Sequence, residues 1–210
     1  MKIWGGKAGG NPMRVAIFLA EKGVDIPFEP VDLMKGDHRV EAFRAKNPIA
    51  QVPVLELDDG TCISETIAIC RYFERLQPDP PLMGVGALDE AIVEMWQRRV
   101  EFNLYSAARE VFRHSVPFVK ALQPVQLSVW ADYNRPRVLE ALEMLDAQLA
   151  THPFIAGARF TVADITGVFA LQLLGHVQMT IPEDCPSVLR WRNEVFERPS
   201  VASVIGRPAA

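Results

Sequence analysis

The sequence predicts an α/β domain followed by an all-helical domain. Over residues 1–80, short apolar stretches typical of strands alternate with stretches of helical periodicity, whereas beyond residue 88 the period stays helical. Between them, three prolines within four residues, at positions 78, 80 and 81, cannot continue a helix. We therefore expect a first domain of residues 1–80 and a second of residues 88–210.

The strands of the first domain follow from short apolar or alternating segments. They are predicted at residues 2–4, 28–32, 52–57 and 61–63. A hairpin turn at Asp58-Asp59-Gly60 joins the last two strands. The order β-α-β-α-β-β-α implies a parallel pair at the start, to which the hairpin adds antiparallel strands.

The helices of the first domain are marked by their ends. Asn11 is suited to cap the first helix, with Pro12 at its first position and Gly23 just after its end. Residues 38–46 form a polar stretch with a weak helical pattern. Ser64 is expected to cap the last helix of this domain.

Apolar residues at helical spacing predict four helices in the second domain. The third opens on Thr161-Val162-Ala163-Asp164, which has the form of a capping box with Asp in place of the usual Glu. The predicted helices are residues 88–114, residues 138–149, a helix running to Leu174, and a helix from Pro186 that stops near Pro199.

Composition excludes several classes of protein. A formal net charge of −4 gives no basic stripe for nucleic acid, and no apolar run reaches the eighteen or so residues of a membrane-spanning helix. The first twelve residues lack the apolar core of a signal peptide. Three cysteines without CxxC spacing suggest neither a disulfide framework nor a zinc site, so we expect a reducing cytoplasm.

Pro53 is unusual because it lies between Val52 and Val54 in a predicted strand. A proline there is compatible with a cis Val52–Pro53 peptide, which would turn the N–H and C=O of Val52 away from the sheet. Groups that face outward in this way can pair with an extended peptide. The alternative is an edge-strand proline that only blocks aggregation.

A second candidate feature follows at Ser64-Glu65-Thr66, where a helix begins. The free N–H groups and the positive end of the dipole at a helix start favour a carboxylate, and Glu65 can bind an ammonium group. The pair suits the head group of an α-amino acid. The alternative is a capped helix with a surface glutamate.

The sequence resembles the cytosolic glutathione transferases of bacterial type in four segments, with no class assigned. In chain order these are NPMRVAIFLAEKG, NPIAQVPVL, SETIAICRYF and FTVADI. The resemblance covers essentially the whole chain. It implies a thioredoxin-like N-terminal domain that binds glutathione, followed by an all-helical domain that carries the pocket for an electrophile.

The resemblance also implies roles for particular residues. Val52 with Pro53 would pair with the cysteine backbone of glutathione, and Gln51 would bind its backbone or carboxylate. Glu65 and Thr66, where the family more often has Ser, would hold the γ-glutamyl head group. His38 and Arg39 lie where several classes place basic groups for the glycine carboxylate; without the resemblance they are interpreted as a solvated helix face.

The loop after the first strand departs from the family pattern. Many members place a Ser, Tyr or Cys there to stabilise the thiolate, but residues 5–13 contain no hydroxyl or thiol. Asn11 is the best remaining side-chain donor, unless its amide is used to cap the helix. The backbone N–H groups of Gly9 and Gly10, and Lys7, are further candidates.

The implied chemistry is attack by the glutathione thiolate on an electrophilic carbon or a peroxide, with no metal and no covalent enzyme intermediate. Tyr105, Arg109 and Arg113 share one helix face and would either assist the thiolate or form part of an interface. Apolar candidates for the electrophile pocket, or alternatively core residues, are Phe102, Phe112 and Phe118.

Partners and competing functions also follow from the resemblance. A homodimer acting in detoxification is implied, with glutathione and a small hydrophobic electrophile as ligands and with neither nucleic acid nor a membrane as partner. Because the loop lacks a hydroxyl, a non-catalytic glutathione-binding or scaffold protein is the alternative. A thiol–disulfide oxidoreductase is disfavoured, since no cysteine lies near residues 8–13.

Overall fold

The computed structural model describes residues 1–7 and 9–206. It divides into two compact units, which we call the N-terminal unit (residues 1–81 with 199–206) and the helical unit (residues 82–198). The last helix of the chain thus belongs with the N-terminal unit, although the sequence places these residues in the second domain.

The N-terminal unit contains a four-stranded sheet in the order β2-β1-β3-β4. β1 (Lys2–Trp4) pairs in parallel with β2 (Phe28–Glu29) and antiparallel with β3 (Val54–Glu56), which pairs antiparallel with β4 (Cys62–Ser64). The parallel pairing of β1 with β2 and the antiparallel hairpin of β3 and β4 confirm the strand directions predicted from the sequence. β2 and β3 are shorter than predicted because Pro30 and Pro53 have no N–H to donate.

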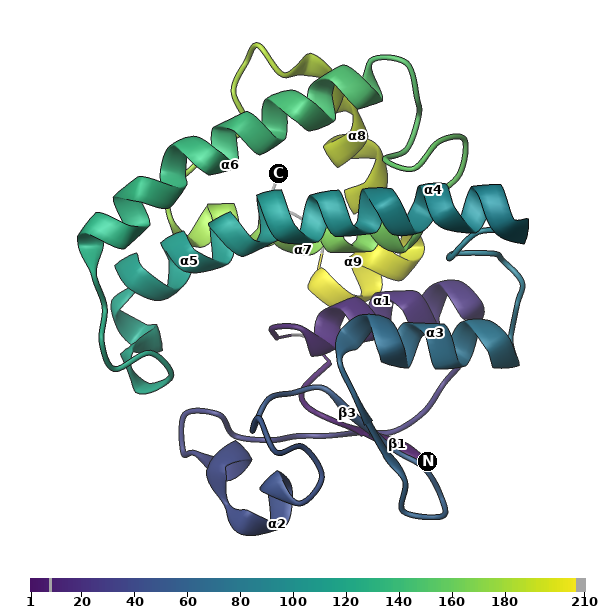
Figure 1. Ribbon diagram of the computed structural model, residues 1–210, viewed down its shortest axis with the longest axis vertical. Coiled ribbons are helices and arrows are strands. Elements are labelled where there is room, and N and C mark those ends of the chain that lie inside the picture. The colour runs from purple at the N-terminus through teal and green to yellow at the C-terminus, as the bar shows by residue number, and fades with distance from the viewer. Residues whose placement is uncertain (8, 207–210) are drawn as a thin grey trace. The chain divides into compact units, whose positions relative to one another are not determined.

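Helices cover the two sides of this sheet. α1 (Pro12–Lys22) and α3 (Thr66–Leu76) lie side by side on one side, and the 3₁₀ turn η1 (Asp37–Arg39) leads into α2 (Glu41–Arg44) on the other (Figure 1). α9 (Pro199–Ile205) packs beside α1. This helix was not predicted, because Pro199 was interpreted as the end of a helix when it is also a favourable first residue.

A buried lysine ties α1 to the end of the N-terminal unit. The Lys22 side chain is fully buried and lies 2.5 Å from a carboxylate oxygen of Glu74 on α3. Its ammonium group also donates to the carbonyl oxygens of Pro78 and Pro80, at 3.2 and 2.5 Å. A buried charge needs such partners, so this cluster fixes the proline-rich segment against both helices.

The helical unit begins with one continuous helical run. α4 (Gly86–Arg99) passes into a π-helical segment, η2 (Val100–Tyr105), and then into α5 (Ser106–Ser115). This confirms the predicted extent of the first helix, apart from the π-helical segment. A 3₁₀ turn and three helices follow: η3 (Pro117–Ala121), α6 (Ser128–Leu149), α7 (Val162–His176) and α8 (Pro186–Phe196).

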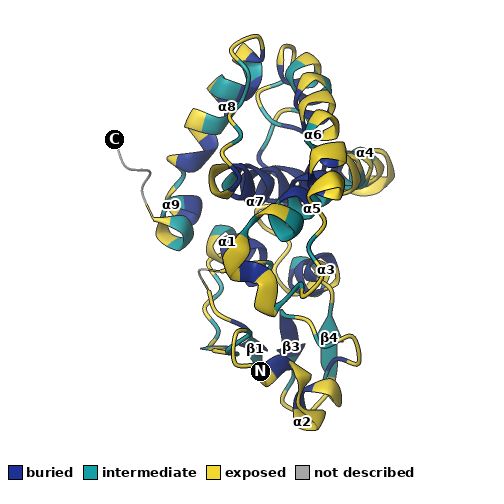
Figure 2. Ribbon diagram, turned by 90° about the vertical axis from the view of Figure 1, so that its left-hand side faces the viewer, coloured by how far each residue is buried: buried dark blue, intermediate teal, exposed yellow. Residues whose placement is uncertain are grey.

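α7 forms the core of the helical unit and is buried along almost its whole length (Figure 2). It begins as the capping box predicts, because Asp164 Oδ2 accepts from the N–H and the hydroxyl of Thr161, at 2.8 and 3.1 Å. Asp164 Oδ1 accepts from the Ile155 N–H and from Trp191 Nε1, at 2.9 and 2.8 Å. One carboxylate thus joins α7 to α8 and to the preceding loop.

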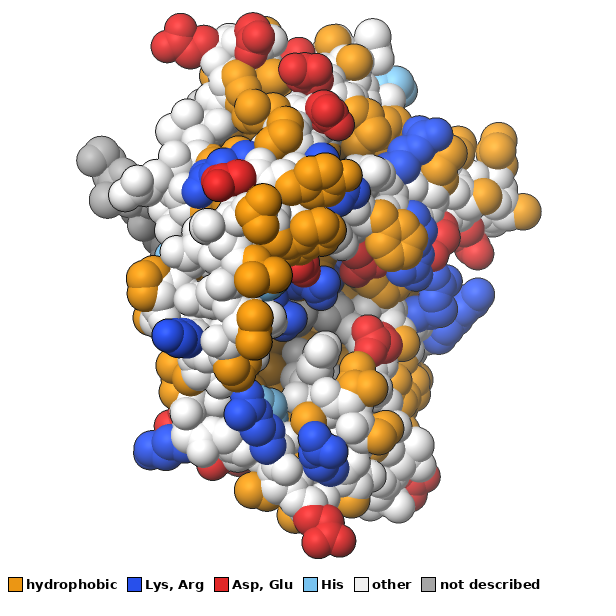
Figure 3. Space-filling view, turned by 60° about the vertical axis from the view of Figure 1, so that its left-hand side comes forward, with side chains coloured by type: hydrophobic (Ala, Val, Ile, Leu, Met, Phe, Trp, Pro, Cys, Tyr) orange, Lys and Arg blue, Asp and Glu red, His pale blue; other side chains and the backbone are white. Residues whose placement is uncertain are grey.

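The surface carries a mixture of side-chain types. On the face shown in Figure 3, Lys and Arg side chains are interspersed with hydrophobic and acidic ones, in keeping with the small net charge. Among the described residues, no helix combines the length and the apolar character needed to cross a membrane.

Candidate functional site

Four loops meet at one end of the sheet in the N-terminal unit. In the strand register, Trp4 at the end of β1 pairs with Glu29 at the end of β2 and with Val54 at the start of β3. Val54 in turn pairs with Ser64 at the end of β4. The loops at this end of the strands, with the first residue of α3, carry the residues expected to bind glutathione or its thiolate: Asn11, His38, Arg39, Gln51, Val52, Pro53, Glu65 and Thr66.

The segment before β3 presents the backbone of Val52. The Val52–Pro53 peptide is cis, as expected. Within the described residues no hydrogen bond is made by the N–H or C=O of Val52, which is half-buried. Buried Asn47 shapes this segment, because its Nδ2 donates to the Gln51 carbonyl at 2.8 Å while its Oδ1 accepts from the Ile49 N–H. Val52 is thereby left able to pair with an extended ligand.

The start of α3 differs from the prediction. The helix begins at Thr66 and follows Glu65 rather than Ser64, and no side chain caps it. In the described part of the chain, the N–H groups of Thr66 and Ile67 find no acceptor. The Glu65 carboxylate is exposed and forms no ion pair there. The backbone of Glu65 has a φ of 69°, which is unfavourable for a residue with a Cβ. Backbone strain of this kind is concentrated at functional sites.

The start of α1 lies against Val52. A Cβ added to Gly5 would stand 2.7 Å from Pro12 Cγ and 3.3 Å from Val52 Cβ, so only glycine allows this approach. Asn11 occupies the N-cap position, but its side chain makes no capping bond, which contradicts that use of the amide. Its Oδ1 instead accepts from Nη1 of Arg14, a buried cation, at 3.4 Å.

The loop after β2 carries His38 and Arg39. Asp32 organises it, because Oδ1 accepts from the N–H groups of Met34 and Lys35, both at 3.0 Å. These contacts hold the pKa of Asp32 below its usual range, with the Lys35 N–H making the largest contribution. His38 is only 7% exposed, so the interpretation of this stretch as a solvated face is wrong for that residue.

Two residues of this region were given no role in the sequence analysis. Asn47 belongs to an Asn-Pro pair, a turn signal that suggests a local hydrogen bond without naming its partner. Arg14 is a lone cation within the apolar pattern of α1, and this position was the only available sign that it would be buried. Both hold a predicted site residue in place.

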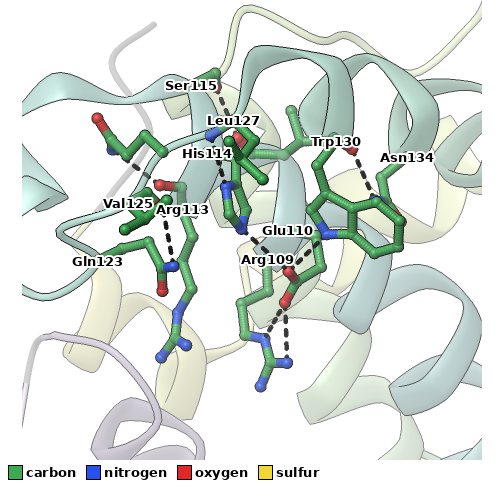
Figure 4. Close-up of polar contacts among 12 residues, drawn as sticks. Arg109, Glu110, Arg113, His114, Ser115, Gln123, Val125, Leu127, Trp130 and Asn134 are labelled. Atoms are coloured by element: carbon green, nitrogen blue, oxygen red, sulfur yellow. Dashed lines mark hydrogen bonds and ion pairs between the residues drawn. The ribbon is translucent and has the colours of Figure 1, made fainter.

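A second polar cluster lies in the helical unit (Figure 4). Glu110 accepts from Trp130 Nε1 at 3.0 Å and from two nitrogens of Arg109, at 3.2 and 3.0 Å. His114 Nε2 lies 3.6 Å from Glu110, and its Nδ1 accepts from the Leu127 N–H. Burial raises the pKa of Glu110, but the Trp130 and Arg109 contacts outweigh it and leave the pKa lowered.

The residues predicted to share a face of the long helix differ in their surroundings. Tyr105 lies in the π-helical segment, is buried, and packs against Phe169 with ring centroids 5.3 Å apart. Arg109 is paired with Glu110. Tyr105 ends the π-helical segment and the two arginines follow it within α5, so the predicted i, i+4 spacing holds from Tyr105 onward.

The three phenylalanines considered for the electrophile pocket do not form one cluster. Phe112 packs edge-on against Phe118 at 5.8 Å and against His176 at 5.5 Å. Phe102 stands 59% exposed on the long helix, beneath the guanidinium of Arg98. Phe112 and Phe118 therefore form one aromatic cluster to which Phe102 does not belong.

None of the three cysteines is placed as a redox pair. All are free, and Cys70 and Cys185 are buried. Burial raises the pKa of the Cys70 thiol to about 12, so it remains a thiol at neutral pH.

The fold and the site together define a two-domain protein with a thioredoxin-like first domain and a helical second one. The glutathione S-transferase N-terminal domain model matches residues 1–75, and the corresponding C-terminal domain model matches residues 114–199. The chain belongs to the glutathione S-transferase family of enzymes.

Individual relatives agree with this assignment. Glutathione S-transferase 2 of Saccharomyces cerevisiae is 35% identical over 98% of this chain and 89% of its own, and its crystal structure superimposes with a TM-score of 0.92. A glutathione S-transferase domain-containing protein of Marinobacter aquaeolei is 40% identical, with a TM-score of 0.91 over 96% of this chain and all of that one. A glutathione S-transferase-I bound with lactoylglutathione is 29% identical, with a TM-score of 0.81 over 99% of both chains.

Proposed function

We propose that the protein binds glutathione at this end of the sheet and joins its sulfur to a small hydrophobic electrophile. The observation that carries the proposal is the unpaired backbone of Val52 beside an uncapped start of α3 that bears Glu65. The family assignment and the relative bound with lactoylglutathione support glutathione as the ligand.

The head group of glutathione fits the start of α3. Its α-carboxylate would accept from the N–H groups of Thr66 and Ile67 and from the Thr66 hydroxyl, at the positive end of the helix dipole. Its ammonium group would pair with Glu65. Because both ligand charges are matched, a ligand without the γ-glutamyl group would bind poorly.

The rest of the tripeptide fits the neighbouring loops. The cysteine residue would exchange two hydrogen bonds with the N–H and C=O of Val52, in the manner of an added strand. Gln51 would bind the peptide backbone or a carboxylate. His38 and Arg39 would hold the glycine carboxylate.

The sulfur would lie at the start of α1. Lowering a thiol pKa of about 8.5 by two units requires roughly 2.7 kcal/mol of preferential thiolate stabilisation. The Asn11 amide at the start of α1 is the proposed donor: its oxygen accepts from the Arg14 guanidinium, and its NH₂ group is of the donor type that a thiolate accepts from. The N–H groups of Gly9 and Gly10 would add to it.

The reaction is a displacement or an addition at an electrophilic carbon, with the glutathione sulfur as the nucleophile. In a displacement, the thiolate forms a bond to an electrophilic carbon while the bond to the leaving group breaks, and that group departs with the electron pair. With a peroxide, the thiolate would take one oxygen as the O–O bond breaks and the alcohol leaves, and a second glutathione would then convert the resulting sulfenic acid to glutathione disulfide and water. The helical unit would supply apolar surface, for which the aromatic cluster of Phe112 and Phe118 is the best candidate.

A homodimer is proposed from the long helix of the helical unit. Leu88, Met95 and Phe102 are 77%, 40% and 59% exposed and recur every seven residues, so they form an apolar stripe. A second copy of the chain would bury such a stripe. A cytoplasmic location and a role in detoxification stay predictions.

Retention on immobilised glutathione, followed by conjugation of an aryl halide, tests the proposal. Saturable binding with turnover is the expected result. Glu65→Gln should weaken retention, whereas Glu41→Gln, at an exposed glutamate in the first turn of α2, should not. Failure to bind glutathione at millimolar concentration would refute the proposal.

The loop without a hydroxyl or thiol favours one other candidate, a glutathione-binding protein without catalysis. Binding without turnover across aryl halides, epoxides and peroxides would establish it. Asn11→Ala would then leave the baseline rate unchanged.

A further inference from the structure

The helical unit carries an arginine whose charge is paired with no carboxylate. Arg113 lies half-buried in the last turn of α5, and in the described part of the chain its guanidinium makes no hydrogen bond and no ion pair. The C-terminal end of a helix favours a cation through its dipole, but this does not satisfy the five N–H donors of the guanidinium. Arg113 is therefore available to an anion that comes from outside the chain.

Arg109, one helical turn earlier, adds to the positive charge. Its Nε and Nη2 donate to Glu110 Oε1, at 3.2 and 3.0 Å, and its Nη1 makes no hydrogen bond to any described residue. Burial raises the pKa of Glu110, whereas the Trp130 contact, Arg109 and Arg113 lower it, so the charge of Arg113 acts on this carboxylate without pairing with it. Two guanidinium groups thus face a single carboxylate of the protein.

The same face of α5 carries aromatic surface. Phe112 follows Arg109 by three residues and immediately precedes Arg113, so all three side chains lie toward one side of the helix. The Phe118 ring meets Phe112 edge-on at 5.8 Å and is 60% exposed. In Figure 4 the guanidinium groups of Arg109 and Arg113 project in the same direction. An unpaired cation and accessible aromatic surface are therefore adjacent.

We propose that the electrophile is an aromatic acid, whose ring packs against Phe112 and Phe118 and whose carboxylate accepts from Arg113 and from Nη1 of Arg109. This inference rests on the proposed function and names the chemical class of its second substrate. The planar guanidinium of Arg113 matches a carboxylate with two parallel N–H donors. Its charge also offsets the repulsion between that carboxylate and the attacking thiolate, which slows the same reaction in water.

Two aryl halides of similar shape test the proposal. They are a chlorodinitrobenzoate with its carboxylate opposite the chlorine, and the methyl ester of the same acid. In both, the thiolate forms a bond to the carbon that bears the chlorine, and chloride leaves with the electron pair of the C–Cl bond. Only the acid is an anion at neutral pH. When each kcat/KM is divided by the rate constant of the uncatalysed reaction with glutathione, the wild type should favour the acid about tenfold.

Substitutions of Arg113 show whether its charge causes this preference. Arg113→Met should lower kcat/KM for the acid about tenfold and for the ester less than twofold, whereas Arg113→Lys, which keeps the charge but not the fork of donors, should lose about threefold on the acid. The matched control is Arg192→Met, because Arg192 is also half-buried in the helical unit and lies over a phenylalanine ring, that of Phe196, at 5.2 Å. It should change neither rate. All three variants should stay bound to immobilised glutathione, which shows that they are folded.

Other roles for Arg113 give different results. If it stabilised the thiolate, Arg113→Met would slow the acid and the ester by the same factor and would raise the thiol pKa of bound glutathione before any electrophile is added. If it served only the fold or an interface between subunits, the free energy of unfolding or the oligomeric state would change while the preference for the acid stayed the same. Each of these results would overturn the inference.

The outcomes also separate the two proposals. If the wild type neither binds glutathione nor conjugates the ester, the proposed function fails. If it conjugates the ester but does not favour the acid over the uncatalysed reaction, or if Arg113→Met keeps the wild-type preference, then only the assignment of an aromatic acid is overturned.

Discussion

The starts of α3 and α7 each follow a hydroxyl residue in the sequence, Ser64 and Thr161, but differ in whether a carboxylate of the protein lies at the helix start. At α7, a buried carboxylate of the protein, Asp164, accepts four hydrogen bonds. At α8, Asp146 accepts from the N–H groups of Ser187 and Val188, at 2.7 and 3.0 Å. At α3, no side chain caps the helix, and the residue before it has a strained φ.

The start of α7 therefore stabilises the fold, whereas the start of α3 is available to a ligand. The helical unit supplies its own carboxylates and gains a fixed core, whereas the N-terminal unit leaves a helix start open beside an exposed glutamate. An open helix start is a site for an anion supplied from outside. Substitutions at the two places should therefore affect different measurements.

The largest expected effect is at α7. Asp164→Ala removes the acceptor of four buried donors and should lower the free energy of unfolding by about 4 kcal/mol. Denaturation by urea measures it, with Asp132→Asn, on an exposed carboxylate of α6, as the matched control. A cost below about 1 kcal/mol would show that the capping box does not hold the helical unit together.

The next largest effect is the change in stability with pH that comes from the same carboxylate, Asp164. Burial raises the pKa of Asp164 from 3.8 to about 6, so between these values the folded protein keeps a proton that the unfolded chain has lost. The Asp164 contribution to stability is thus full below pH 4, falls as the pH rises to about 6, and is level above. The difference between wild type and Asp164→Asn should change by up to about 3 kcal/mol across this window, and a constant difference would contradict the shift.

A substitution at the start of α3 should affect the affinity for glutathione rather than stability. Glu65→Gln removes the proposed partner of the glutathione ammonium group and should weaken binding about 30-fold, or roughly 2 kcal/mol, with little change in unfolding. Calorimetric titration measures the affinity, and Glu41→Gln serves as the control. Equal affinities for wild type and Glu65→Gln would place the head group elsewhere.

The smallest expected effect is at α1. Asn11→Ala should raise the pKa of the bound glutathione thiol by about one unit, or roughly 1.4 kcal/mol, because the proposed donor to the thiolate is lost. Thiolate absorbance of the complex against pH measures it. Asn193→Ala is the control, since Asn193 also accepts from an arginine but lies exposed on α8. An unchanged thiol pKa would assign the thiolate to the backbone amides of Gly9 and Gly10.

The fold was largely predictable because its signals are local. Gly23 ends α1, and the capping box begins α7, through groups within a few residues of each other. The π-helical segment at residues 100–105 has no comparable local signal. Pro199 is ambiguous, since proline both ends a helix and begins one.

The elements that carry the proposed site residues were predictable, but the contacts of those residues were not. The resemblance named Glu65 and Val52, and the strand register brings their loops together. That Ser64 does not cap α3, that Asn11 faces Arg14, and that His38 is buried all depend on contacts that the sequence pattern does not encode. Such contacts depend on side-chain conformation and on packing, neither of which leaves a periodic signal in the sequence.

Hydrogen exchange at single amides, with and without glutathione, tests the central claim most directly. The account predicts that the N–H groups of Val52, Thr66 and Ile67 exchange quickly in the free protein and become protected as glutathione saturates it, while those of Thr161 and Asp164 do not change. Saturable binding without added protection at Val52 and Thr66 would contradict it.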